Sequence, residues 1–393
     1  MLPRSASRSA TGTDVVVLDD ASHLHDYLPH WEDLARNAIE PNVFYEPWML
    51  LPALRAFGPG EDLMFALVVE RDAQGPAPLD PSRLLGFFPL QRRRHYRRMP
   101  VPMLCLWRHV HCFLCTPLVR ASRARECLAA FLAWLERDSP APMIEWGWIA
   151  ADGPFHHALA RALDEAGRPV FEAERHTRGL LRRRSSADAY LAEALAGSSR
   201  KELRRQERRL AELGELQYAA GPAADAPRWI EQFLALEASG WKGQRGSALG
   251  SSPAALDFFR SAAGEGARRG RLEMLGLLVS GRPIALKCNF VAQGSGAFAF
   301  KIAYDEAFRR YSPGMLLELE NIRRFHAASG AGAAEWMDSC ADPDHFMVNR
   351  LWLDRRSMLT RITATGRAPG DLMVSALPLM RWLYRRAKSA AAG

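Results

Sequence analysis

The stretch that most constrains the fold is residues 297–325, which read AFAFKIAYDEAFRRYSPGMLLELENIRRF. Its first part alternates apolar side chains at Phe298, Phe300 and Ile302, which is the two-residue period of a β-strand. Its last part spaces apolar side chains three and four residues apart, as a helix with one apolar face does. These helical positions are Met315, Leu316, Leu319, Ile322 and Phe325. The sequence therefore predicts a strand, a tight turn and a helix in direct succession.

The turn between this strand and this helix has the composition of an anion-binding helix N-terminus. Ser312 is of a type preferred as an N-cap, and Pro313 suits the first helical position, which needs no N–H donor. Gly314 and Met315 would then present free N–H groups, and Gly314 has no Cβ to hold a ligand away from the backbone. The residues just before this corner are Arg309, Arg310 and Tyr311. We expect residues 309–315 to bind a phosphate or pyrophosphate.

The same residues carry a family resemblance. The pattern Arg309-x-x-Ser312-x-Gly314 resembles the acyl-CoA pyrophosphate loop of GNAT acyltransferases, with Ser312 in the place of the first glycine. A wider ordered set resembles the FemAB-like branch, which includes proteins described as CelD/BcsL-type or BioF2-like acetyltransferases. That set is Gly240-Trp241-Lys242-Gly243, Lys301-x-x-Tyr304-Asp305, Tyr311-Ser312-Pro313-Gly314 and a late Asp and Trp, at Asp338 and Trp352. The resemblance extends over about residues 198–356 and is weaker in the first half of the chain.

This resemblance implies transfer of an acetyl or other acyl group from acyl-CoA to an amine or hydroxyl, on a sugar or cell-envelope precursor. A backbone N–H near residues 300–303 would polarise the thioester carbonyl. Side chains proposed to contact the acceptor are Trp241, Lys242, Tyr304, Asp305 and Asn349. Trp241 and Lys242 could equally form an ordinary surface turn. Two other functions stay open: a Fem-type transferase that uses aminoacyl-tRNA, and a non-catalytic binding module on a degenerate fold.

Three side chains are candidates for catalysis. Asp338 ends an expected strand beside the central one, where a carboxylate entering an apolar cleft can have a raised pKa and act as a base. A strand-end cap or a salt bridge is the equal alternative for Asp338. His345 has an ordinary pKa suited to proton transfer, or it serves in packing and hydrogen bonding. Lys301 interrupts an apolar strand and should face a negative group, either a substrate anion or an acidic neighbour such as Asp305.

The rest of the chain follows one plan twice. A helix pair, a hairpin, a helix and a strand are expected in each half, with hairpins at residues 63–90 and 272–291. We therefore expect an α/β fold of tandem GNAT-like domains, each a twisted, mixed and mainly antiparallel sheet flanked by helices. The expected boundaries are a tail at 1–13, an N-terminal domain at 14–184, a linker with a basic helix at 185–214 and a C-terminal acyltransferase domain at 215–393.

Charge suggests the kind of partner. The 393 residues carry a net charge of +8, mostly from arginine, which favours CoA, nucleotide sugars, tRNA or an acidic lipid surface, unless the composition is simply arginine-rich. The helix expected at 198–214 is either a solvated helix or a phosphate-binding one. The amphipathic segment 372–388 is apolar and basic, and it could cap the core or lie on a membrane surface.

Cysteine usage and hydropathy suggest the compartment. Six cysteines without regular spacing suit a reducing cytoplasm, and no apolar stretch is long enough to span a bilayer. We expect a cytoplasmic protein, with contact to the inner membrane face left open. Cys112 and Cys115 lie near two histidines, but their spacing is cramped for a zinc motif and also suits a buried strand. We expect no metal. The motifs of serine hydrolases, P-loop proteins and zinc proteases do not occur.

Overall fold

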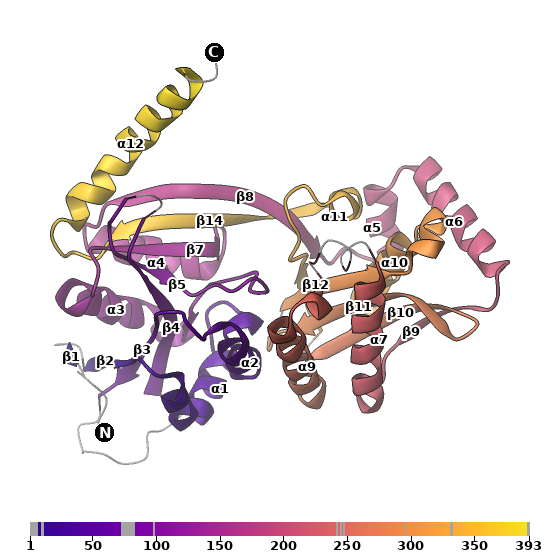
Figure 1. The fold of residues 1–393 in the computed structure, drawn as a ribbon, viewed down its shortest axis with the longest axis horizontal. Helices are drawn as coiled ribbons and strands as arrows, with labels where there is room; N and C mark the ends of the chain where they lie inside the picture. Colours follow the sequence, from indigo (N-terminus) through magenta and orange to yellow (C-terminus); the bar gives the residue numbers. More distant parts are fainter. Residues whose placement is uncertain are drawn as a thin grey trace. The chain divides into compact units, whose positions relative to one another are not determined.

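The computed structural model describes residues 7–8, 12–71, 83–96, 99–240, 243, 246, 248–294, 296–330 and 333–390. The chain divides into two compact units (Figure 1). Unit 1 consists of Met1–Pro47, Gly60–His176 and Ser357–Gly393, and unit 2 of Trp48–Pro59 and Thr177–Arg356. Each unit combines a sheet with helices.

The sheet of unit 1 is mixed and mainly antiparallel. Its strands are β1 (Ser7–Arg8), β2 (Thr13–Leu18), β3 (Leu63–Glu70), β4 (Leu84–Arg93), β5 (Met103–Leu106), β6 (Leu118–Val119), β7 (Met143–Ala150), β8 (Val170–Arg182) as far as His176 and, from residue 357 onward, β14 (Asp354–Ala364). Strands β1 to β5 follow one another in antiparallel order, and β14 is antiparallel to β7. β5 and β7 form the parallel pair, and α3 (Ala124–Asp138) connects them.

Helices cover this sheet because their apolar faces are rich in aromatic residues. The other helices of unit 1 are η1 (Ala21–Tyr27), α1 (Leu28–Arg36), η2 (Val43–Tyr45), η4 (Ala121–Arg123), α4 (Pro154–Glu165) and α12 (Gly370–Ala390). The Phe131 ring of α3 stacks on Phe88 of β4, with centroids 3.9 Å apart. Trp31 of α1 packs on Phe87, with centroids 4.4 Å apart. Burial of these large rings is the main stabilising contribution to the core.

Unit 2 has the same kind of sheet. It contains the last residues of β8 (Val170–Arg182), then β9 (Leu216–Ala220), β10 (Leu272–Val279), β11 (Arg282–Val291), β12 (Gly296–Tyr304) and β13 (Trp336–Asp338). β9 to β12 are antiparallel neighbours, and β13 is parallel to β12 and antiparallel to β8. The helices are α2 (Pro47–Phe57), α5 (Ala187–Ala194), α6 (Gly197–Ala211), η5 (Ala223–Asp225), α7 (Ala226–Ser239), η6 (Leu249–Ser251), α9 (Pro253–Arg268), η7 (Glu306–Tyr311), α10 (Pro313–Ala327) and α11 (Phe346–Leu351).

The sheet of unit 2 is covered on both faces. Lys287 of β11 pairs with Glu318 of α10. The next β11 residue, Cys288, lies opposite Lys301 of β12, so these two residues share a face, and Lys301 pairs with Glu237 of α7. Successive residues of a strand point to opposite faces, so α10 and α7 lie on opposite sides. α9 lies next to α7 (Figure 1). This double cover explains why β12 is buried along most of its length and not only at alternate residues.

The expected fold class is confirmed. Each unit is an α/β structure with a mixed, mainly antiparallel sheet flanked by helices. Each unit also has one parallel strand pair joined by a helix, β5–α3–β7 in unit 1 and β12–α10–β13 in unit 2. In both pairs, three residues of one strand are paired with three residues of the other.

The units differ from the expected boundaries because each contains a segment distant in sequence. Residues 357–393, expected in the C-terminal domain, belong to unit 1, where β14 pairs with β7. Residues 48–59 belong to unit 2, where Trp48 packs on Phe290 and Phe57 on Phe258, with ring centroids 5.6 and 5.3 Å apart. Neither pairing has a signal in the local sequence.

Candidate functional site

The strand–turn–helix predicted at residues 297–325 is present in unit 2. β12 leads into η7, and α10 begins at Pro313, the first helical residue as expected. Ser312 is the N-cap residue, but its backbone is left-handed, with φ 52° and ψ 49°, and its side chain makes no capping hydrogen bond. An N-cap side chain reaches its helix from an extended backbone, so this conformation removes the expected cap. The Ser312 carbonyl accepts a hydrogen bond from the Leu316 amide, 3.1 Å away.

The corner is closed on one side. Gly314 is buried, and a Cβ at this position would lie 3.5 Å from Cδ1 of Tyr304 and 3.9 Å from Sδ of Met347. The expectation that a ligand could approach the Gly314 backbone freely is therefore wrong, because the end of β12 and α11 fill that space. Ser312 and Met315 are half-buried. An anion would reach the first turn of α10 on their side.

The surroundings of this corner are strongly basic. Arg309 and Arg310 of η7 are exposed, and Nη2 of Arg310 donates to the Tyr311 hydroxyl at 2.6 Å. The basic helix α6, which packs against η7, supplies further arginines. The helix dipole of α10 adds to this field, by about 0.3–1 kcal/mol for one charge at an exposed terminus. The expected phosphate-binding residues thus form part of a larger cationic region.

A cavity of about 240 Å³ lies within this region, between α5, α6 and α10. Its lining includes Leu316 and Leu319 of α10 and three cations, Arg200, Arg204 and Arg323. Two acids also line it, and one of them, Glu207, accepts a hydrogen bond from the Tyr218 hydroxyl at 2.6 Å. Among the described residues, the buried Nε of Arg200 has no hydrogen-bond partner. A buried donor without a partner is costly, and a phosphate oxygen would satisfy it.

Asp338 is an ion-pair residue. Its carboxylate is fully buried, with Oδ1 2.7 Å from Nε of Arg178 and Oδ2 2.9 Å from Nη1 of Arg356. The Cys340 amide donates to Oδ1 at 2.9 Å. Burial alone would raise the pKa of this carboxyl, but the two guanidinium charges and these hydrogen bonds lower it below its usual value. The expectation of a raised pKa is wrong, and the salt-bridge alternative describes this residue.

Lys301 and Asp305 also face protein groups. Nζ of Lys301 lies 3.5 Å from Oε1 of Glu237, whose other oxygen accepts from the Leu249 amide at 2.8 Å. The acidic-neighbour alternative therefore describes Lys301, with Glu237 in place of the expected Asp305. Asp305 caps η7 by accepting from the Ala307 amide at 3.0 Å, and its other oxygen pairs with Arg282 at 2.5 Å.

Two of the remaining candidates, His345 and Asn349, belong to α11 or its N-cap. His345 is the N-cap of this helix, and its Nδ1 accepts from the Val348 amide at 3.3 Å. Asn349 is exposed and donates to the Pro343 carbonyl at 2.7 Å. Tyr304, at the end of β12, is half-buried against Gly314. Trp241 and Lys242 lie outside the described residues.

Sequence reasoning missed a buried polar network between β11 and α10. Nζ of Lys287 lies 2.9 Å from Oε2 of Glu318. Oε1 of Glu318 accepts hydrogen bonds from Trp352 at 3.0 Å and from Asn321 at 2.8 Å. Asn321 in turn accepts from Asn289 at 2.8 Å. A signal existed, since Glu318 and Asn321 are three residues apart on the apolar face of α10, and buried polar groups need partners. The network also gives Trp352 a core position.

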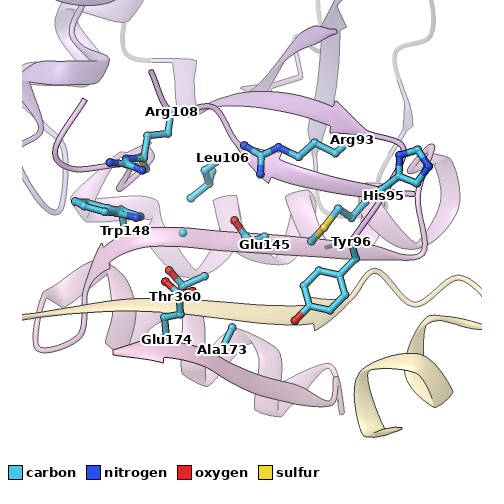
Figure 2. Close-up of a pocket in the computed structure, with 13 residues that line it drawn as sticks. Arg93, His95, Tyr96, Leu106, Arg108, Glu145, Trp148, Ala173, Glu174 and Thr360 are labelled. Atoms are coloured by element: carbon cyan, nitrogen blue, oxygen red, sulfur yellow. The ribbon is translucent and has the colours of Figure 1, made fainter. Parts of the chain in front are cut away.

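Unit 1 contains a cavity of its own, of about 340 Å³ (Figure 2). It runs along β5, from Met103 at the start of the strand to Leu106 and Arg108 at and beyond its end, and Glu145 of β7 also lines it. Figure 2 shows Arg108 above Trp148 at one end, Tyr96 and His95 at the other, and Glu145 between them. The Arg108 guanidinium carbon is 3.6 Å from the centroid of the Trp148 ring.

A bulge in β7 shapes the floor of this cavity. The register with β14 shifts between Leu359 and Arg361, and Trp148 adopts a left-handed backbone with φ 53°. Such a conformation costs a bulky residue about 1–3 kcal/mol and is most often found where a site needs it. Gly147 lies between the two polar side chains of the floor: a Cβ built on Gly147 would lie 3.4 Å from Oε1 of Glu145 and 3.9 Å from Oγ1 of Thr360. The floor thus offers a carboxylate and a hydroxyl, and the rim offers the arginines Arg93 and Arg108.

The cysteine–histidine cluster is packed in the core of unit 1. Sγ of Cys112 and Sγ of Cys115 are 3.8 Å apart, and both residues are buried. Burial, followed by the hydrogen bond with Cys115, raises the pKa of the Cys112 thiol well above its usual value. In the described parts of the chain, no three histidine, cysteine or acidic side chains are grouped so as to hold a metal ion.

The family comparison concerns unit 2. Residues 197–345 match the model of an acetyltransferase (GNAT) domain. This matched segment includes the basic helix α6, the β12–η7–α10 corner and Asp338. Comparison with curated proteins finds no match.

Solved structures resemble almost the whole chain. FemX is similar with a TM-score of 0.53 and 11% identity, over 88% of this chain and 96% of FemX. A conserved Bacteroides thetaiotaomicron protein of unknown function has a TM-score of 0.51 and 11% identity, over 88% of this chain and 98% of its own. A third similar structure is the C-terminal domain of an Agrobacterium fabrum protein provisionally assigned as a lysylphosphatidylglycerol synthetase. It has a TM-score of 0.50 and 13% identity, over 91% of this chain and 97% of that domain. At these identities the likeness shows a shared, FemAB-like fold.

Proposed function

We propose that this protein is an acyltransferase of the CelD/BcsL type that uses acyl-CoA, in the first instance acetyl-CoA. The observation that carries the proposal is the position of the GNAT match. It covers a segment in which a strand, a helix N-terminus and a dense group of arginines come together. The groups that would bind a pyrophosphate are the Met315 amide, Arg309 and Arg310, and the partnerless Nε of Arg200 would take a further phosphate oxygen.

Acyl transfer requires little from the protein beyond holding the acceptor and the thioester in position. The acceptor nitrogen or oxygen attacks the thioester carbonyl carbon, the carbon–sulfur bond breaks, and the acceptor proton passes to the departing thiolate or to solvent. A backbone N–H of β12 near residues 300–303 would stabilise the oxyanion. Asp338, already neutralised by two arginines, is proposed as a structural residue and not as the base.

We propose separately that the cavity of unit 1 binds a polar small molecule. Glu145 and Thr360 at its floor suit hydroxyl or amine donors, and the arginines at its rim suit a carboxylate or phosphate. Sugar and cell-envelope precursors carry such groups. The cavity volume of about 340 Å³ lies at the lower end of the usual range for small-molecule sites, about 300–1,000 Å³.

Donor binding can be tested by calorimetric titration of the full chain with acetyl-CoA. Replacing both Arg309 and Arg310 by alanine should weaken binding at least about tenfold, since each removes a charged phosphate contact. The matched control replaces Arg125 and Arg268, whose side chains are 81% and 68% exposed, and should bind within about twofold of wild type. Equal loss in both variants would mean a general charge effect and contradict the proposed site.

A second candidate, a Fem-type transferase that uses aminoacyl-tRNA, is favoured by the likeness to FemX and by the basic helix α6. It predicts tight tRNA binding that weakens steeply with salt, because phosphate contacts release counterions. No acetyl-CoA binding together with such tRNA binding would replace the first proposal by this one. Binding of neither would leave a non-catalytic module. If acetyl-CoA binds, CoA-thiol release across a panel of sugar and amine acceptors identifies the acceptor.

A further inference from the structure

The helix α12 has two apolar faces, and only one of them is packed. Val374 and Leu377 are buried in a cluster of unit 1 that includes Phe171 and Ile362. This contact agrees with the expectation that the segment caps the core. At about 100° per residue, Leu372, Leu379 and Leu383 fall within about 40° of one another, on the side opposite to Val374 and Leu377. The second face therefore points away from the cluster against which the helix packs.

This outer face is exposed along its whole length. Leu372 is 74% exposed, Leu379 60% and Leu383 52%, with Met380 and Trp382 on either side at 40% and 50%. Among the described residues, nine large apolar side chains are this exposed, and five of them lie in α12. Single exposed apolar residues are common, but a continuous stripe marks a surface that something covers. We call these five residues the outer stripe.

The charged residues of α12 from Leu372 onward are all basic. From Leu372 to Ala390 the helix contains no acidic residue, and it contains Arg381, Arg385, Arg386 and Lys388. The Arg386 guanidinium carbon lies 4.7 Å from the centroid of the Trp382 ring. A helix that combines an apolar stripe, a tryptophan and basic residues without acidic ones has the composition of a helix that lies in a lipid–water interface. Within the described chain, no helix is sufficiently long and apolar to traverse a bilayer.

We propose that α12 binds the surface of an anionic lipid bilayer through the outer stripe. The leucines and Trp382 would enter the boundary between headgroups and acyl chains, and Arg386, beside Trp382, would face lipid phosphates. A second copy of the chain is a poorer occupant, because from Leu372 to Ala390 neither helix has an acidic residue that could pair with Arg386 of the other. The helix stays anchored to unit 1 by Val374 and Leu377 in both states.

The test is sedimentation of the full chain with vesicles of phosphatidylglycerol and phosphatidylcholine, compared with vesicles of phosphatidylcholine alone. We expect binding to the anionic vesicles that weakens with salt, and at least tenfold weaker binding to the neutral ones. Leu379→Glu with Leu383→Glu should lower binding to anionic vesicles at least tenfold. Arg386→Gln should lower it about fivefold, as one basic residue near such a surface contributes about 1 kcal/mol.

The matched control is Val110→Glu with Leu213→Glu, which makes the same chemical change at residues 64% and 50% exposed elsewhere in the chain. It should bind within about twofold of wild type. Equal binding by the stripe variant and the control overturns the proposal. So does a lipid-free dimer, seen by light scattering, that the stripe variant abolishes, since the stripe would then be an interface between copies. Far-UV circular dichroism and the melting temperature confirm that each variant is folded.

Discussion

The Asp338 carboxylate lies between two guanidinium groups, and this arrangement determines its chemistry. A base must give its lone pair to a substrate proton, whereas both oxygens of Asp338 already contact Arg178, Arg356 or the Cys340 amide. Cys340 has a left-handed backbone, with φ 52°, and the hydrogen bond from its amide helps to hold that conformation. Asp338 thus fixes the chain where β13 ends.

We predict that Asp338→Asn destabilises the fold by about 3–5 kcal/mol, because it leaves two buried guanidinium groups without their counter-charge. Urea unfolding measures this loss, and Asp26→Asn, at a carboxylate 78% exposed, should change stability by less than about 0.5 kcal/mol. A variant as stable as wild type but without turnover would restore the catalytic role.

The same ion pairs give this prediction a pH dependence. Because the folded pKa of Asp338 is lowered, its ionised form stabilises the fold at all pH values above the unfolded pKa, about 3.9. This contribution is lost only as pH falls through the lower, folded pKa. The stability difference between wild type and Asp338→Asn should therefore be constant between about pH 5 and 7 and shrink at more acidic pH.

At the scale of elements, the junction of η7 and α10 shows what one sequence can predict. The strand and helix periods are local, and both elements are present, with Pro313 in the first helical position. The left-handed backbone of Ser312 was not predicted, because a serine at an N-cap usually has an extended backbone. Ion pairs between residues distant in sequence could not be predicted either. Arg178 precedes Asp338 by 160 residues, and no pattern in either segment links them.

We predict that Ser312→Gly leaves stability within about 1 kcal/mol of wild type, whereas Ser312→Val lowers it by about 1–3 kcal/mol. Glycine adopts the left-handed region without strain but has more freedom in the unfolded chain, and these effects nearly cancel. A β-branched residue adds strain there. Denaturant unfolding of both variants is the measurement, and Ser312→Gly should keep acetyl-CoA binding. Equal stability of the valine variant would mean that the junction is not strained.

At the scale of the whole molecule, the two units are interleaved along the chain. Unit 2 needs residues 48–59, which pack on Phe258 and Phe290, and it needs Arg178 of β8, which pairs with Asp338. Unit 1 needs β14 and α12, which follow unit 2 in sequence. A boundary drawn from the repeated order of helices and strands cannot show this exchange, because the repeat describes the order of elements and not their partners.

We predict that neither of the fragments 1–184 and 185–393 folds by itself. The first lacks β14 and the buried Val374 and Leu377, and the second lacks the aromatic residues of α2 and the counter-charge Arg178. Each should show no cooperative thermal transition by circular dichroism, and co-expression of the two should restore one, because together they contain every segment of both units. A cooperative transition of fragment 185–393 alone would show that Trp48, Phe57 and Arg178 are dispensable, and the interleaved division of the chain would then be wrong.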